Sequence, residues 1–403
     1  MAKPSGPSCN LNCSYCFYTE KTALFGEGVE PRMSDEVLES YVSKYISSQD
    51  TPEVAFAWQG GEPTLMGIDF FKKILDLQNR YSQGKAITNS IQTNGVMLSE
   101  KWCAFLAEHN FLVGLSLDGP REINDLHRVN RAGKPTFRSV LEAVRRLRKH
   151  AVEFNILSCV TRESSKKPME VYYFLKSEGV QFVQFIPIVE RMPDAGAGKL
   201  GLKFASPPGP RQPDAPVTGW SVDPAGWGDF LTAIFDEWVR HDVGRVFVMN
   251  FEWTVAGWAG IKHTVCTHSQ RCGDCLVLEH NGDIYACDHY VYPEYKRGNI
   301  LTDDLSRIVW SEQQSLFGAA KETGLTAQCR ECAVLSVCRG DCLKHRFAVS
   351  KTGETGHSYL CEGYLKFFSH SRPYMMRMLD LISSGLPADH IMPLADDPLA
   401  IYR

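Results

Sequence analysis

The chain has 403 residues, of which 44% are hydrophobic and 22% charged, and its formal net charge is only −4. This balance is typical of a globular protein and excludes a disordered or fibrous chain. The length exceeds what one core usually supports, so we expect a large domain and a smaller one. Because the basic residues are scattered, we expect no nucleic-acid partner.

No apolar run approaches the ~20 residues that span a bilayer. The first residues, Met-Ala-Lys-Pro-Ser-Gly, lack the apolar core of a signal peptide. We therefore expect a cytoplasmic protein with no membrane partner. Cytosolic thiols are kept reduced, so the fourteen cysteines are expected to bind metal or do chemistry rather than pair as disulfides.

In the first half of the chain, short apolar segments alternate with segments of helical period. The expected strands are residues 54–58, 87–92, 112–117, 154–160 and 182–186, and the expected helices between them are 35–47, 69–81, 100–109, 137–149 and 168–177. Strands joined by helices form a parallel sheet, and five or six such units predict a full or partial TIM-type α/β barrel. The loops after the strands should then carry the chemistry.

The regular pattern changes at both ends of this barrel. Only eight residues precede Cys9, so the first strand must be very short or differently formed. A Gly, Pro, Ala and Ser-rich stretch at 193–223 predicts a flexible insertion or linker, and a helix at about 227–240 follows. The later cysteine-rich part predicts a small domain held by metal. We assign residues 1–240 to the barrel, 241–375 to this second domain and 376–403 to a tail.

Three early cysteines, Cys9, Cys13 and Cys16, have Cys-x3-Cys-x2-Cys spacing. A 4Fe-4S cluster normally takes four thiolates, so three would leave one iron open to a ligand. With Tyr15 before the third cysteine, the triplet resembles the signature of the radical S-adenosylmethionine (SAM) superfamily. That resemblance implies that the open iron binds SAM and that the reduced cluster splits it to a 5′-deoxyadenosyl radical.

Polar motifs follow three successive expected strands, so they should lie on one face of the barrel. They are Gln59-Gly60-Gly61-Glu62-Pro63-Thr64, Gln92-Thr93-Asn94-Gly95 and Ser116-Leu117-Asp118-Gly119-Pro120. The first resembles the Gly-Gly-Glu motif that holds the SAM amino group, where adjacent glycines allow a close backbone approach. The superfamily resemblance implies SAM contacts from Tyr15, Gly61, Ser116, Arg128 and Val189. Arg131, one helical turn from Arg128 if that stretch is helical, is an open alternative to Arg128.

Nine cysteines lie between residues 266 and 361. Their spacing resembles the SPASM extension of peptide-modifying radical SAM enzymes, which carries two auxiliary 4Fe-4S clusters. The resemblance implies that Cys266, Cys272, Cys287 and Cys342 hold one cluster, and that Cys329, Cys332, Cys338 and Cys361 hold the other. Cys275 is then an unused thiol, either packed as an apolar residue or able to replace Cys272 as a ligand.

Zinc is the alternative that the cysteines alone leave open. Eight ligands in the second domain would also fit two tetrahedral zinc ions by count. The first loop could hold zinc with Cys103 or Cys159 as its fourth ligand. The radical SAM motifs favour iron–sulfur clusters at all three places.

Four further segments extend the resemblance from the superfamily to one family within it. They are Cys16-Phe17-Tyr18, Trp58-Gln59-Gly60-Gly61-Glu62-Pro63-Thr64-Leu65, Gln184-Phe185-Ile186-Pro187 and Cys287-Asp288-His289-Tyr290. Together they resemble the anaerobic sulfatase-maturating enzymes, from Lys3 to about Phe368. That family converts a cysteine or serine of an unfolded sulfatase into Cα-formylglycine.

The family resemblance implies a role for three further residues. Asp288 would accept the thiol or hydroxyl proton of the target, while Tyr18 and Gln59 would line the peptide site. An electron would leave through the auxiliary clusters, and we expect a redox partner such as flavodoxin or ferredoxin.

Three other functions stay open from the sequence. A radical SAM maturase that forms thioether or carbon–carbon crosslinks in a ribosomal peptide would use the same three clusters. A metal-stabilised binding module would use the cysteines only to hold its fold. Radical modification of RNA is disfavoured by the scattered charges.

Overall fold

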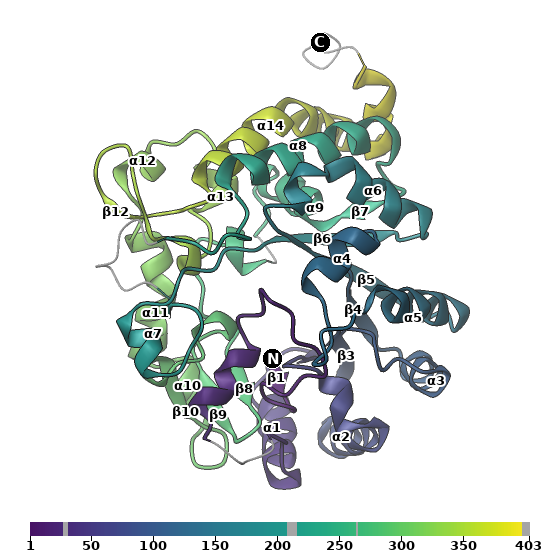
Figure 1. The fold of residues 1–403 in the computed structure, drawn as a ribbon, viewed down its shortest axis with the longest axis vertical. Coiled ribbons are helices and arrows are strands. Elements are labelled where there is room, and N and C mark those ends of the chain that lie inside the picture. Colours follow the sequence, from purple (N-terminus) through teal and green to yellow (C-terminus); the bar gives the residue numbers. More distant parts are fainter. Residues whose placement is uncertain (27–30, 208–215, 263–264, 397–403) are drawn as a thin grey trace.

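The computed structural model describes residues 1–26, 31–207, 216–262 and 265–396, so residues 208–215 of the expected insertion lie outside it (Figure 1). Its main sheet has ten strands in the order β10-β9-β8-β1-β2-β3-β4-β5-β6-β7. Strands β1 to β7 are Ala2–Lys3, Glu53–Trp58, Ala86–Thr93, Leu112–Ser116, Phe154–Val160, Phe182–Pro187 and Phe247–Val248. Consecutive strands from β1 to β7 pair in parallel, which confirms the expected α/β barrel architecture.

Five of the helices that connect the strands begin and end close to the expected residues, whereas α4 was not expected. They are α1 (Asp35–Ser47), α2 (Ile68–Tyr81), α3 (Glu100–Glu108), α4 (Arg121–His127), α5 (Phe137–Lys149) and α6 (Pro168–Ser177). The hydroxyls of Ser34 and Ser99 cap α1 and α3 by accepting the N–H of Val37 and Trp102. The five expected helices each bury several apolar side chains in the core, which explains why periodicity located them, whereas the short α4 buries only one apolar side chain, Ile123.

Strand β1 is only two residues long, which confirms the short first strand. It lies between two parallel neighbours: Ala2 pairs with Trp58 of β2, and Ala2 and Lys3 pair with Leu278 and Glu279 of β8. The antiparallel strands β8 (Val277–Glu279), β9 (Asp283–Tyr285) and β10 (Lys296–Asn299) therefore extend the barrel sheet. The cysteine-rich region is thus joined to the barrel by backbone hydrogen bonds.

The rest of the cysteine-rich region is built of short elements. They are α9 (Met249–Trp258), α10 (Leu305–Val309), α11 (Glu312–Thr323), α12 (Ala327–Arg330), α13 (Leu335–Cys338) and the hairpin β11 (Ala348–Val349) and β12 (Thr355–His357). The long helix α14 (Cys361–Ser383) packs along α8 (Pro224–His241) and continues past residue 376, where we expected a tail to begin (Figure 1). Among the helices described, none is long and apolar enough to cross a membrane.

The described parts of the 193–223 insertion fold back over the protein rather than linking two domains. A short helix, α7 (Ala195–Lys199), packs with Leu202 against Tyr292 of the cysteine-rich region. The carboxylate of Glu20 accepts the N–H of Phe204 at 3.1 Å. The described part of the insertion therefore contacts both Glu20, which follows the first cysteine loop, and the second domain.

Helices α8 and α14 approach most closely at a pair of glycines. A Cβ added to Gly228 would lie 2.7 Å from the Cα of Gly363, and no flexible side chain there could move aside. We predict that Gly228→Ala forces the helices apart and lowers stability by about 1–3 kcal/mol. The midpoint of urea unfolding checks this. Gly198→Ala, at a helical position with open space, is the control and should unfold at the wild-type midpoint.

Candidate active site

The loop carrying Cys9, Cys13 and Cys16 begins where β1 ends and is held from the opposite side of the barrel. The N–H of Asn12 donates to the carbonyl of Val129 at 2.8 Å, and the guanidinium of Arg131 donates to the carbonyl of Cys9 at 2.7 Å. Each of the three thiols interacts electrostatically with the other two. Burial raises the pKa of Cys9 and of Cys13 to about 12, so cluster binding must displace their protons.

The Gly60-Gly61-Glu62 turn packs directly on this loop. A Cβ on Gly61 would lie 2.0 Å from the carbonyl oxygen of Ser8, so only glycine fits beside the cysteine loop. The buried carboxylate of Glu62 accepts hydrogen bonds from the backbone and hydroxyl of Thr64, the hydroxyl of Thr93 and the backbone N–H of Asn94. Glu62 therefore joins the ends of β2 and β3, and burial raises its pKa.

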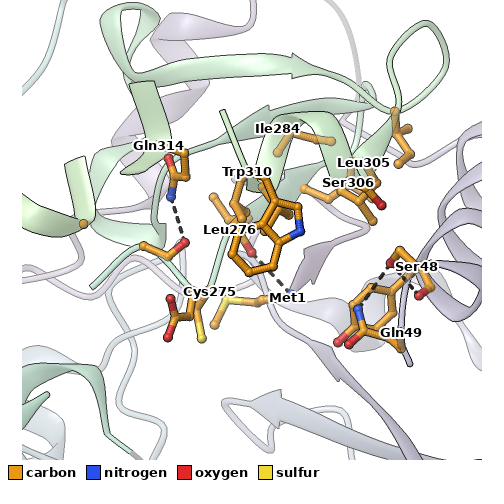
Figure 2. Close-up of a pocket in the computed structure, with 18 of the residues that line it drawn as sticks. Met1, Ser48, Gln49, Cys275, Leu276, Ile284, Leu305, Ser306, Trp310 and Gln314 are labelled. Atoms are coloured by element: carbon orange, nitrogen blue, oxygen red, sulfur yellow. Dashed lines mark hydrogen bonds between the residues drawn. The ribbon is translucent and has the colours of Figure 1, made fainter. Parts of the chain in front are cut away.

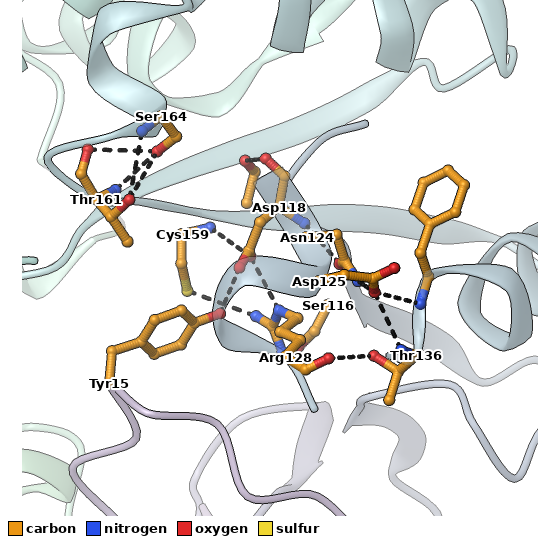
Figure 3. Close-up of polar contacts among 12 residues, drawn as sticks. Tyr15, Ser116, Asp118, Asn124, Asp125, Arg128, Thr136, Cys159, Thr161 and Ser164 are labelled. Atoms are coloured by element: carbon orange, nitrogen blue, oxygen red, sulfur yellow. Dashed lines mark hydrogen bonds and ion pairs between the residues drawn. The ribbon is translucent and has the colours of Figure 1, made fainter. Parts of the chain in front are cut away.

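Asp118 occupies the corresponding place after β4 (Figure 3). Its carboxylate accepts the Tyr15 hydroxyl and the backbone N–H of Cys159, and it lies 3.0 Å from Nε of Arg128. Arg128 is buried in this cluster, whereas Arg131 is exposed and holds Cys9. The structure thus places both candidate arginines at the cysteine loop but in different positions.

The remaining expected SAM and peptide residues lie at the same edge of the sheet. The Ser116 hydroxyl accepts a hydrogen bond from Gln92 at 3.2 Å, and Val189 is buried just after β6. The backbone N–H of Gln59 donates to the carbonyl of Ala2 at 2.9 Å, and its side chain is half-buried. Strand ends β2, β3, β4 and β6 therefore surround the first cysteine loop, as the parallel sheet predicts.

In the second domain, the structure brings together the four cysteines expected to hold one of the auxiliary clusters. A cavity of about 270 Å³ is lined by Cys329, Cys332, Cys338 and Cys361, so the space fits a closed four-thiolate cluster. In the other group, the Cys287 thiol lies in electrostatic range of Cys342 and Cys266, and Cys272 in range of Cys266. Cys342 therefore interacts with Cys287, and the assignment of these four cysteines to one cluster stays a prediction.

A tight loop, Cys338-Arg339-Gly340-Asp341-Cys342, connects these two groups. Its three central residues all have positive φ, at 51°, 72° and 62°. The buried guanidinium of Arg346 donates to the carbonyls of Arg339, Gly340 and Lys321 at 2.9, 2.7 and 2.6 Å. Arg346 therefore holds a strained loop whose two ends are the expected ligands of different clusters.

Asp288 follows Cys287 and faces the first strand of the barrel. Its carboxylate forms an ion pair with Lys3, whose side chain is 3% exposed against 24% for Asp288. The Lys3 ammonium also lies 3.3 Å from the centre of the Tyr18 ring, and the Tyr18 hydroxyl is 2.7 Å from each carboxylate oxygen of buried Glu279. Burial raises the pKa of Asp288, but the charges of Lys3, His289 and Lys344 and the hydrogen bond from Lys3 together outweigh burial, and the pKa lies below its usual range. The carboxylate is thus ionised at neutral pH.

Cys275 is exposed, so the expectation that it packs as an apolar residue is wrong. It lines a cavity of about 630 Å³ between α1 and the second domain, and Cys272 lines the same cavity. The exposed ring of Trp310 lies among the lining residues (Figure 2). Of the thiols suggested for a zinc loop, Cys103 packs in the apolar core, while Cys159 lies beside Asp118.

Comparisons with known proteins agree with this arrangement. Residues 4–174 match the radical SAM superfamily, and residues 266–333 match an iron–sulfur cluster-binding domain, SPASM. A serine-type anaerobic sulfatase-maturating enzyme of Bacteroides thetaiotaomicron is 43% identical over 402 residues, covering 100% of this chain and 96% of the relative. A cysteine-type enzyme of Clostridium perfringens is 31% identical, covering 95% and 98%.

Solved structures show the same relationship. The structure described as native anSMEcpe with bound AdoMet has a TM-score of 0.82 and 30% identity, covering 94% of this chain and 98% of that one. The fold and the clustered cysteines therefore define a radical SAM enzyme with a SPASM domain and 4Fe-4S clusters. Within that class, the chain belongs to the anaerobic sulfatase-maturating enzymes.

Several residues of the site were not singled out from the sequence. Asp118 lies inside a motif that we noted, and Glu279 ends a short apolar strand. An acidic residue at the end of an apolar segment was therefore a usable signal for both, and the structure shows that both are buried. Lys3 and Arg346 carried no such signal, because an isolated lysine or arginine is usually exposed. Only the three-dimensional contacts distinguish them.

We predict that Arg346→Met loosens the loop between Cys338 and Cys342. The substitution removes the donor from three carbonyls, two of them in buried hydrogen bonds, at a cost of about 1–3 kcal/mol for each buried one. Iron should be lost from the auxiliary sites while SAM cleavage at the first cluster persists. Iron analysis and 5′-deoxyadenosine assay check this, and the exposed Arg307→Met is the control. Wild-type iron content in Arg346→Met would contradict the role of the guanidinium.

Proposed function

We propose that this chain oxidises a cysteine or serine side chain in a sulfatase polypeptide to Cα-formylglycine. The observation that carries the proposal is the position of Asp288. It brings an ionised carboxylate from the second domain to the end of β1, next to Tyr18 of the first cysteine loop. The full-length similarity to sulfatase-maturating enzymes of both serine and cysteine type supports the substrate class.

The residues would divide the cofactor binding as follows. Cys9, Cys13 and Cys16 hold the first cluster, and Tyr15, Gly61, Ser116, Arg128 and Val189 hold SAM. In the second domain the cysteine groups described above hold the auxiliary clusters. When bound, these groups supply a 5′-deoxyadenosyl radical that takes a hydrogen atom from the target Cβ, and a route by which one electron leaves to a flavodoxin- or ferredoxin-like partner.

Asp288 performs the proton chemistry. Its carboxylate takes the proton of the target thiol or hydroxyl, which together with loss of the hydrogen atom and the electron completes a two-electron oxidation. A serine target then gives the aldehyde directly. A cysteine target gives a thioaldehyde, which water hydrolyses to the aldehyde and hydrogen sulfide. Tyr18 and Gln59 would contact the peptide. A polypeptide substrate is supported by a similar structure, with a TM-score of 0.81, that is described as native anSMEcpe with bound AdoMet and Kp18Cys peptide.

The test is an anaerobic reaction of the iron-loaded enzyme with SAM, a reductant and a sulfatase-motif peptide in Cys and Ser versions. We expect 5′-deoxyadenosine and peptide aldehyde, measured by mass spectrometry. Replacement of Cys9, Cys13 and Cys16 by Ala should abolish both products while the auxiliary clusters remain. Deoxyadenosine with a crosslinked peptide instead of an aldehyde would favour the crosslinking maturase and refute this proposal.

Asp288→Asn separates hydrogen abstraction from proton transfer. The amide keeps the shape of the side chain but cannot accept the proton, so we expect SAM cleavage to continue while aldehyde formation falls by about 10²-fold or more. The rates of both products in one reaction check this. Aldehyde at the wild-type rate would show that another group is the base.

A further inference from the structure

Lys3 lies where the barrel and the second domain meet. It is the second residue of β1, and its Cα is paired with that of Glu279 in β8. Its ammonium lies over the ring of Tyr18 and forms an ion pair with Asp288. A single side chain therefore touches the residue expected to accept the proton and a residue expected to contact the peptide.

The neighbouring carboxylates explain why the ammonium is directed to Asp288. Burying a charged amine is costly unless an opposite charge compensates it. Glu279 is fully buried and is already engaged, since both of its oxygens lie 2.7 Å from the Tyr18 hydroxyl. Asp288 is the partially exposed acid of the two, and it lies on a short turn, Asp288–Tyr290. Lys3 is thus fixed by its strand, whereas the Asp288 side chain depends on the ion pair for its position.

We propose that Lys3 is a positioning residue that holds the Asp288 carboxylate beside the Tyr18 ring, where the target side chain is bound. The inference rests on the proposed function, because it assigns Lys3 to the base of that reaction. The parallel pairing of β1 with β8 places Lys3, and the Glu279 contact with Tyr18 places the ring beneath it. The carboxylate then has one preferred position relative to both.

This role predicts uncoupling rather than general loss of activity. Lys3 touches neither Tyr15 nor Arg128 in the contacts described, so hydrogen abstraction should proceed without it. A carboxylate that is no longer held would accept the target proton less often. SAM would then be cleaved without formation of aldehyde, because a small misplacement of a catalytic group costs a large factor in rate.

The experiment compares wild-type enzyme with Lys3→Met and Lys3→Arg in the anaerobic peptide reaction. The measured quantity is the ratio of aldehyde to 5′-deoxyadenosine. Lys3→Met keeps the apolar stem and should lower the ratio at least about tenfold. Lys3→Arg keeps a cation that can pair with the carboxylate and should recover most of it. An unchanged ratio in Lys3→Met would overturn the inference, whatever the absolute rate.

Lys21→Met is the matched control. Lys21 is also buried and lies 3.3 Å from the centre of an aromatic ring, but the ring is that of Tyr292. We expect its ratio to stay at the wild-type value even if the protein is less stable. An equal fall of the ratio in Lys21→Met and Lys3→Met would overturn the inference, because loss of any buried cation would then suffice.

Loss of iron and failure of the proposed function can each be distinguished from failure of the inference. If Lys3→Met does not retain its iron, Lys3→Gln decides, because it fills the site with a neutral polar group, and a wild-type ratio in that variant overturns the inference. If wild-type enzyme forms deoxyadenosine but no aldehyde with either peptide, the proposed function fails instead. A simple structural role for Lys3 predicts that iron, deoxyadenosine and aldehyde fall together at constant ratio.

Discussion

Strand β1 hydrogen-bonds to β2 on one side and to β8 on the other, and both domains contribute to the site through this one segment. Two residues suffice as a strand because each neighbour supplies a parallel partner. The cysteine loop begins directly after it, so its position is set by the same pairing. A shift of β1 would move the first cluster loop and Lys3 relative to Asp288 together.

Buried carboxylates organise the loops around this strand. Glu62, Asp118 and Glu279 each stand at or just after a strand end, and each accepts hydrogen bonds from the cysteine loop or a neighbouring strand end. A buried carboxylate is tolerated only when donors or cations satisfy it, so each one fixes the groups that surround it. The loops that would carry the cofactors are thereby ordered by protein contacts.

Periodicity located the barrel because β2 to β6 are long enough to show an apolar pattern and are separated by amphipathic helices. Cysteine spacing and the polar motifs likewise indicated the cluster sites and the strand-end residues. The pairing of β1 with β8 could not be predicted in this way, because strands of two and three residues carry no period and are 274 positions or more apart. The docking of the insertion on the protein also depends on contacts, such as Glu20 with Phe204, that composition does not encode.

The pairing of β1 with β8 also brings together site residues that come from two different domains. The barrel provides Cys9, Cys13, Cys16 and Lys3, while Asp288 and Glu279 come from the second domain. Tyr18 bridges them, with its ring under Lys3 and its hydroxyl on Glu279. Because Lys3 pairs with Asp288 and the Tyr18 hydroxyl donates to Glu279 across the boundary, separation of the domains would break both contacts. The electrostatics that hold the proposed base in place therefore also hold the two domains together.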